Sequence, residues 1–145
     1  SVLMRFAGGA HGVLTASQVC IGEGNGLTLR VHGDKGSLWW RQETPDELRV
    51  ALHDQNPVIY SRGGPDLHED AEVSARIPQG HPEGYLEAFA NIYKGAIDAI
   101  IAHRDGSAPS RMAQLIPTIN DGMRGVRFVE RCVQSAKKNA QVDWA

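Results

Sequence analysis

The stretch GHPEGYLEAFANIY, residues 80–93, contains the residue types in this chain that are best suited to binding chemistry. It places an imidazole, a carboxylate and a phenol, those of His81, Glu83 and Tyr85, just before the apolar pattern of a helix that takes hold at Leu86. An imidazole and a phenol can each hydrogen-bond a ligand. The cluster is therefore either a ligand site or simply a favourable helix start.

The structural interpretation explains most of these residues. His81 would lie near the N-cap, and Pro82 would take the first helical position, where its missing N–H is no loss. Glu83 would stabilise the helix dipole, so that Glu83→Gln would cost well under about 1 kcal/mol. Gly84 fits poorly, because glycine in a helix interior costs about 1 kcal/mol relative to alanine. A glycine at this position predicts that something lies close against the first turn of the helix. On these residues alone, the ligand site and the favourable helix start both stay open.

Other constellations give no catalytic residue, metal site or cofactor-binding fingerprint. The six histidines are scattered, and the spacing of His81, Glu83 and Glu87 does not converge on one helix face, which argues against a metal. The glycine-rich GEGNG, residues 22–26, leads into a predicted strand and not a helix, so we expect a hairpin loop and not a phosphate cradle. No G-x-S-x-G motif marks a nucleophilic serine.

Composition restricts the class of protein. A length of 145 residues suggests one domain, and a formal net charge of −2 argues against a nucleic-acid partner. No apolar run of about 18 residues is present, so no membrane span is expected. Cys20 and Cys132 lack a CxxC motif and are expected to be buried free thiols in a reducing compartment, which places the protein in the cytoplasm.

The periodicities predict an α+β fold: an open-faced, mostly antiparallel sheet of about six or more strands with two main helices on one face. Strands are expected within residues 2–61, and residues 62–79 are expected to run irregularly over the surface. One helix is expected from Pro82 to residues 104–106, and a second begins at Thr118, with Asp121 completing a capping box. Residues 141–144 are expected to form a last short strand.

The predicted sheet has more apolar surface than two helices on one side can cover. Trp39 and Trp40 are adjacent in a strand and must point to opposite faces. We therefore expect the sheet to self-associate into a homo-oligomer. Because a strand begins at residue 2 with no approach segment, the chain is also expected to be a piece of a longer protein.

Five stretches, in this order, resemble the second domain of the glucose–fructose oxidoreductase / inositol dehydrogenase (Gfo/Idh/MocA) family. They are GVLTASQV (12–19), NGLTLRVHGDKGSLWW (25–40), ETPDEL (43–48), GHPEGYLEAFANIY (80–93) and PTINDGMRGVRFVE (117–130). The resemblance covers nearly the whole chain, so residues 1–145 would be the C-terminal substrate-binding and oligomerisation domain of a two-domain oxidoreductase.

The resemblance implies a Rossmann domain, absent from this chain, that holds NAD or NADP and is the partner of this domain. It implies an activity on the hydroxyl or carbonyl groups of sugars, cyclitols or related polyols, a free sheet face in the subunit interface, and a substrate pocket shaped by His81 and Tyr85. The family's Glu-Lys-Pro lysine and its Asp/His pair are missing from this sequence. The isolated chain is therefore expected to be inactive, and the alternative is a stand-alone dimerisation or ligand-binding module without enzymatic activity.

Overall fold

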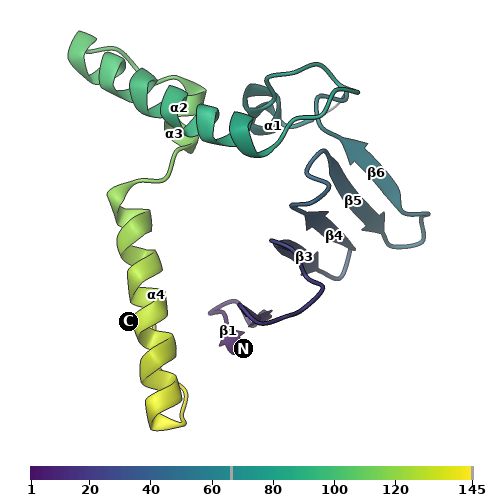
Figure 1. Cartoon of the computed structure of the whole chain (residues 1–145), viewed down its shortest axis with the longest axis vertical. Coiled ribbons are helices and arrows are strands. Elements are labelled where there is room, and N and C mark those ends of the chain that lie inside the picture. The colour runs from purple at the N-terminus through teal and green to yellow at the C-terminus, as the bar shows by residue number, and fades with distance from the viewer. Residues whose placement is uncertain (66, 145) are drawn as a thin grey trace. The chain divides into compact units, whose positions relative to one another are not determined.

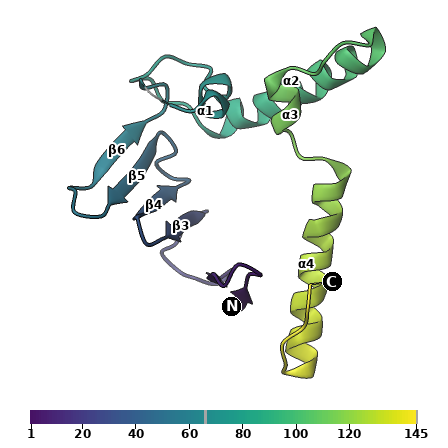
Figure 2. The same ribbon diagram turned by 180° about the vertical axis from the view of Figure 1, so that it is seen from behind.

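The computed structural model describes residues 1–65 and 67–144, shown from two sides in Figure 1 and Figure 2. The chain forms two compact units. Residues 24–116 make the larger unit, and residues 1–23 together with 117–144 make the smaller one. The described residues contain six strands and four helices.

The larger unit contains a four-stranded antiparallel sheet. Its strands are β3 (Thr28–His32), β4 (Gly36–Arg41), β5 (Glu47–Leu52) and β6 (Val58–Ser61), and they pair in chain order. Each strand follows its neighbour through a short turn, as consecutive hairpins require. This confirms the predicted antiparallel meander for these four strands.

The two faces of this sheet differ in chemistry because side chains alternate along each strand. One face carries apolar residues in register, among them Leu29, Trp40, Leu48 and Tyr60. On the other face Trp39 lies between Arg30 and Arg49, whose guanidinium carbons are 4.5 and 5.8 Å from the centre of its ring. Trp39 and Trp40 thus occupy opposite faces, as predicted.

The larger unit also holds three helices: α1 (Glu69–Ser74), α2 (Tyr85–Asp105) and α3 (Arg111–Leu115). Helix α1 lies in the stretch that the sequence predicts to be irregular, and α3 is likewise unpredicted. Both are too short to show a helical periodicity, although His68 and Ser110 accept the N-cap hydrogen bonds that start them. Helix α2 begins at Tyr85 and not at Pro82, with Gly84 as its N-cap.

Helix α2 packs through its small residues. Gly95 and Ala102 are its buried positions, and a Cβ at Gly95 would meet the side chain of Ile116 and lie 2.9 Å from the carbonyl oxygen of Met112 in α3. The predicted apolar stripe of this helix is present, but it lies on a different face from Gly95 and Ala102. This stripe is exposed to solvent: Phe89 is 47% exposed and Tyr93 is 68% exposed. The pattern therefore predicts the helix but not the face that α3 covers.

The smaller unit contains a hairpin and a long helix. Strands β1 (Val2–Arg5) and β2 (His11–Leu14) pair antiparallel around a turn in which Gly9 has a φ of +87°, a conformation that glycine adopts without steric cost. Helix α4 (Ile119–Lys138) starts with the predicted capping box. Its N-cap Thr118 donates its N–H to Asp121 Oδ2 over 2.8 Å, and the Thr118 hydroxyl accepts from the Asp121 N–H.

Several predictions for the smaller unit are wrong. Residues 141–144 form no strand, and Trp144 instead lies 6.5 Å from Phe128 of α4 between ring centres. Residues 22–26 span the boundary between the two units, so the hairpin loop expected there stays a prediction. Neither Cys20, which is exposed, nor Cys132, which is half-buried, is a buried thiol, although both are free.

The α+β class and the antiparallel pairing are confirmed, with the strands divided between a two-stranded and a four-stranded sheet. The docking of both main helices on one sheet face stays a prediction.

Gly95→Ala tests the close approach of α2 to α3. Alanine normally stabilises a helix interior by about 0.5–1 kcal/mol relative to glycine. At Gly95 the added methyl must displace Ile116 and the Met112 carbonyl, so we expect a net destabilisation of about 1–3 kcal/mol. Gly125→Ala in α4 is the matched control, because a Cβ there meets nothing within 4 Å. Urea unfolding of both variants checks this, and equal effects would contradict the close packing.

Candidate functional site

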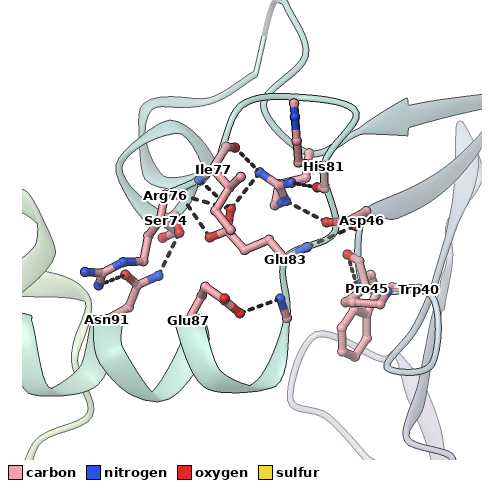
Figure 3. Close-up of polar contacts among 12 residues, drawn as sticks. Trp40, Pro45, Asp46, Ser74, Arg76, Ile77, His81, Glu83, Glu87 and Asn91 are labelled. Atoms are coloured by element: carbon pink, nitrogen blue, oxygen red, sulfur yellow. Dashed lines mark hydrogen bonds and ion pairs between the residues drawn. The ribbon is translucent and has the colours of Figure 1, made fainter.

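A hydrogen bond spans the first turn at the N-terminus of α2 (Figure 3). Gly84 donates its N–H to Glu87 Oε2 over 3.0 Å, and this bond is the first cause of a pKa of Glu87 below its usual value. Because the folded pKa is lowered, this contribution to stability is present at neutral pH and is lost as the pH falls through that folded value. A Cβ on Gly84 would lie 3.3 Å from Pro45 Cγ. The close neighbour that glycine predicts at the first turn is thus confirmed.

Glu83 is the buried polar residue of this region, with 4% of its side chain exposed. Its carboxylate accepts hydrogen bonds from the backbone N–H groups of Arg76, at 2.8 and 3.0 Å, and of Ile77, at 2.9 Å (Figure 3). It also forms an ion pair with Arg62 at 2.7 Å. The carboxylate therefore holds the chain that enters α2 against the residues that leave α1.

Arg62, which follows β6, uses its guanidinium to join three segments. Its Nε donates to Asp46 Oδ1, its Nη1 to the Ile77 carbonyl oxygen and its Nη2 to the His81 carbonyl oxygen, each over 2.6 Å. Asp46 in turn accepts the Glu83 N–H at 3.4 Å, and it precedes β5. We call Asp46, Arg62 and Glu83 the Arg62 clasp, because together they connect the edge of the sheet to the start of α2.

The clasp corrects the prediction for Glu83. The sequence favours a surface carboxylate that stabilises the helix dipole, whereas the structure gives it a buried ion pair and three backbone hydrogen bonds. Its partners lie far away in the chain or in a stretch without periodicity, so spacing alone carries no signal for them. Sequence reasoning missed Asp46 and Arg62 for the same reason.

Further hydrogen bonds join the end of helix α1 to the N-terminal half of α2. Asn91 in α2 donates to the Ser74 carbonyl oxygen over 2.7 Å and accepts from Arg76 Nη1 over 3.1 Å (Figure 3). At the other end of α1, Arg111 pairs with Asp70 and lowers the pKa of that carboxyl. These bonds fix the stretch that supplies the two amide donors of Glu83.

An open depression of about 640 Å³ lies beside the clasp. It is lined by Asp46, Glu47, Ser61, Arg62 and residues 79–82. His81 is among the lining residues, as a ligand-facing residue should be. Tyr85 is not: it is 71% exposed, and its ring meets that of Phe89 edge to face at 5.1 Å between centres. The structure therefore does not bring His81 and Tyr85 into one depression, and their binding role stays a prediction.

Residues 1–65 and 67–144 offer neither a metal site nor a membrane-spanning helix. No group of three or more His, Cys, Asp or Glu side chains is arranged to hold a metal ion there. No described helix combines the length and the hydropathy needed to cross a membrane.

Glu83→Gln tests the clasp. The amide cannot neutralise Arg62, and its NH₂ group would face backbone N–H donors. Breaking a buried pair in this way costs about 3–5 kcal/mol. Glu87→Gln is the matched control, because glutamine also completes a capping box and should lower the melting temperature far less than Glu83→Gln. Thermal unfolding at neutral pH compares the two, and similar melting temperatures for both variants would show that the Glu83 pair contributes little.

Comparison with curated proteins finds relatives over almost the whole chain. It is 32% identical to the uncharacterised oxidoreductase YfiI of Bacillus subtilis over 96% of this chain and 35% of that protein. It is 28% identical to the levoglucosan dehydrogenase of Pseudarthrobacter phenanthrenivorans, over 97% of this chain and 34% of the relative. An inositol 2-dehydrogenase of Rhizobium meliloti is 25% identical over the full chain and 36% of its own length. The chain thus spans about a third of the length of these relatives.

Solved structures share the fold. An oxidoreductase from Pseudomonas syringae superposes with a TM-score of 0.86 at 37% identity, covering 99% of this chain and 39% of that one. An inositol dehydrogenase homologue from Azotobacter vinelandii, solved in complex with NADH and myo-inositol, gives a TM-score of 0.84 at 40% identity, covering 94% of this chain and 36% of that one. Residues 1–144 also match the family described as "Oxidoreductase family, C-terminal alpha/beta domain". The chain belongs to this family, the Gfo/Idh/MocA oxidoreductases, and corresponds to its C-terminal domain.

Proposed function

We propose that this chain is the substrate-side part of an NAD(P)-dependent oxidoreductase that acts on a sugar, a cyclitol or a related polyol. The observation that carries the proposal is the match of the whole chain to the family's C-terminal domain, together with relatives named for levoglucosan and inositol. A solved relative holds NADH and myo-inositol together. All of these relatives are about three times as long as this chain. The activity of the whole protein is therefore also proposed here.

The depression beside the Arg62 clasp is our candidate for part of the substrate pocket. His81 projects from a turn whose backbone is held by Arg62 through the His81 carbonyl oxygen. A side chain on a fixed backbone loses less conformational entropy when it binds a hydroxyl group. The clasp thus positions the turn, and the His81 imidazole is free to hydrogen-bond the ligand.

Two features support the proposal that the cofactor is not held by this chain. The glycine-rich stretch 22–26 leads into β3 and not into a helix, and the Gly84 N–H at the start of α2 is already bonded to Glu87. We assign NAD or NADP to the remainder of the longer protein, a Rossmann domain, where the cofactor would supply the hydride acceptor. This chain would bind and orient the substrate, and it would not bind dinucleotide alone.

The charged face of the four-stranded sheet is our candidate for the subunit interface. Trp39 lies between Arg30 and Arg49 there, and its indole Nε1 is buried without a hydrogen-bond partner among the described residues. Neither guanidinium forms an ion pair within the described chain. Tryptophan and arginine are the residue types that most often dominate the energy of protein interfaces. A second copy would cover this face in a homo-oligomer.

Variants at His81 and Tyr85 test the substrate pocket in the full-length protein. His81→Ala and Tyr85→Phe should each lower kcat/KM by roughly 3- to 100-fold, because a hydrogen bond to a substrate hydroxyl contributes about 0.5–1.5 kcal/mol and up to about 3 where its loss strands a buried partner. Both side chains are exposed, so the melting temperature should not change. Steady-state kinetics with NAD and NADP on a panel of polyols measures the effect. Wild-type kinetics for both variants would contradict a substrate-binding role of the His81 and Tyr85 side chains.

Trp39→Ala tests the interface. Removing a central interface tryptophan costs about 2 kcal/mol or more, so the dissociation constant of the oligomer should rise roughly 30-fold. Trp144→Ala in the smaller unit is the control for the loss of an indole. Sedimentation velocity over a concentration series would show the shift for Trp39→Ala alone. An unchanged distribution would place the interface elsewhere.

A further inference from the structure

The side chains that line the depression fall into two groups. Asp46 and Arg62 are committed to the clasp: the Asp46 carboxylate accepts from Arg62 and Glu83, and the guanidinium bonds two carboxylates and two carbonyl oxygens. Glu47, Ser61, Gln79 and His81 form no side-chain hydrogen bond or ion pair with any described residue, yet all four line the same depression. The first group forms a rigid support, and the second remains available to a ligand.

The available groups are a carboxylate, a hydroxyl, a carboxamide and an imidazole. A carboxylate accepts hydrogen bonds from hydroxyl groups, a carboxamide both donates and accepts, and a serine hydroxyl does the same. Such a set suits a ligand with several hydroxyl groups, each of which is both donor and acceptor. Glu47 begins β5 and Ser61 ends β6, and these two residues are direct cross-strand partners. Two of the four groups are therefore neighbours on the sheet edge.

The charge of the depression restricts the ligand further. Its lining contains two carboxylates, of Asp46 and Glu47, and one guanidinium, of Arg62. That guanidinium already pairs with Asp46 and with the buried Glu83, so the positive charge is neutralised. Apart from the imidazole of His81, which is a cation only when protonated, the lining offers no further cation to a phosphate or a carboxylate of the ligand, while the exposed Glu47 would repel either group.

We propose that this depression binds an uncharged polyhydroxylated ligand and discriminates against the phosphorylated or carboxylated form of the same molecule. The inference rests on the proposed function and deepens it, because it names Glu47 as the residue that sets this selectivity. Glu47 contributes a direct acceptor for ligand hydroxyls and a negative charge that excludes anions. Ser61, Gln79 and His81 complete the hydrogen-bonding set.

The experiment uses the full-length protein and measures binding of four probes by ligand-observed NMR and calorimetry: myo-inositol, glucose, glucose 6-phosphate and glucuronate. The wild type should bind at least one neutral probe, and it should bind glucose 6-phosphate and glucuronate at least about 5-fold more weakly than glucose, since one unit charge at close range in water contributes about that factor. Glu47→Gln should narrow the ratio of the affinity for glucose to the affinity for the anionic probes about 5-fold, and Glu47→Lys should reverse this preference. Glu130→Gln and Glu130→Lys, on α4 and outside the depression, make the same charge changes and should leave the ratio unaltered.

The outcomes separate this inference from the proposed function. Binding of the neutral and anionic probes with equal affinity, or a ratio that moves equally in the Glu47 and Glu130 variants, would overturn the selectivity assigned to Glu47 and leave the polyol function standing. If the wild type binds none of the four probes, both the selectivity and the polyol function fail. High salt should narrow the wild-type ratio, because it screens the charge of the exposed Glu47, and a ratio that high salt leaves unchanged would overturn the exclusion of anions by that charge.

Discussion

The ion pair between Arg62 and Glu83 is the interaction on which the arrangement of the larger unit depends. Only 16% of the arginine side chain and 4% of the glutamate side chain are exposed, so both charges have lost most of their hydration. A buried pair repays that cost only when further hydrogen bonds satisfy both groups. Here the carboxylate receives backbone N–H groups from two consecutive residues, and the guanidinium reaches Asp46 and two carbonyl oxygens. The pair is therefore a junction between the sheet edge, the residues after α1 and the start of α2.

This junction explains why the candidate site lies where it does. The turn before α2 has one backbone hydrogen bond of its own, from the His81 N–H to the Pro78 carbonyl oxygen over 3.3 Å, and its carbonyl at His81 is held by Arg62. The same guanidinium forms part of the wall of the depression. A single arginine thus both stabilises the loop and neutralises the buried carboxylate behind it, leaving the outward-facing side chains of Glu47, Ser61, Gln79 and His81 without internal partners. Stability and binding are assigned to different side chains of one small region.

The apolar surfaces of the larger unit indicate further contacts. The stripe of α2 that includes Phe89 and Tyr93 is exposed, and so are apolar residues such as Leu29 and Tyr60 on one sheet face. Exposed apolar surface of this extent is typical of regions that other parts of a protein or a partner cover. The chain spans about a third of the length of its curated relatives.

The sequence predicts local structure well and long-range contacts poorly. The opposite orientations of Trp39 and Trp40, the capping box of Thr118 and Asp121, and the close neighbour of Gly84 all follow from spacing or from backbone requirements, and the structure confirms them. The short helices α1 and α3 do not, because one or two turns show no periodicity.

The role of Glu83 could not be predicted from the sequence either. A carboxylate near a helix start has the same local pattern whether it faces water or a buried arginine, and Arg62 lies in another element. His81 was identified by its residue type, whereas Glu47, Ser61 and Gln79 join it only through the pairing of β5 and β6 and the path of the loop.

Glu83 holds the residues after α1 through their amide groups, and hydrogen exchange at individual amides can measure this restraint. In the wild-type protein the N–H groups of Arg76 and Ile77, which lie outside any helix or strand, should be protected because both donate to the Glu83 carboxylate. In Glu83→Gln this protection should fall at these two amides, while amides in the middle of α4 keep theirs. Rapid exchange at Arg76 and Ile77 in the wild type, or unchanged protection in the variant, would contradict the account.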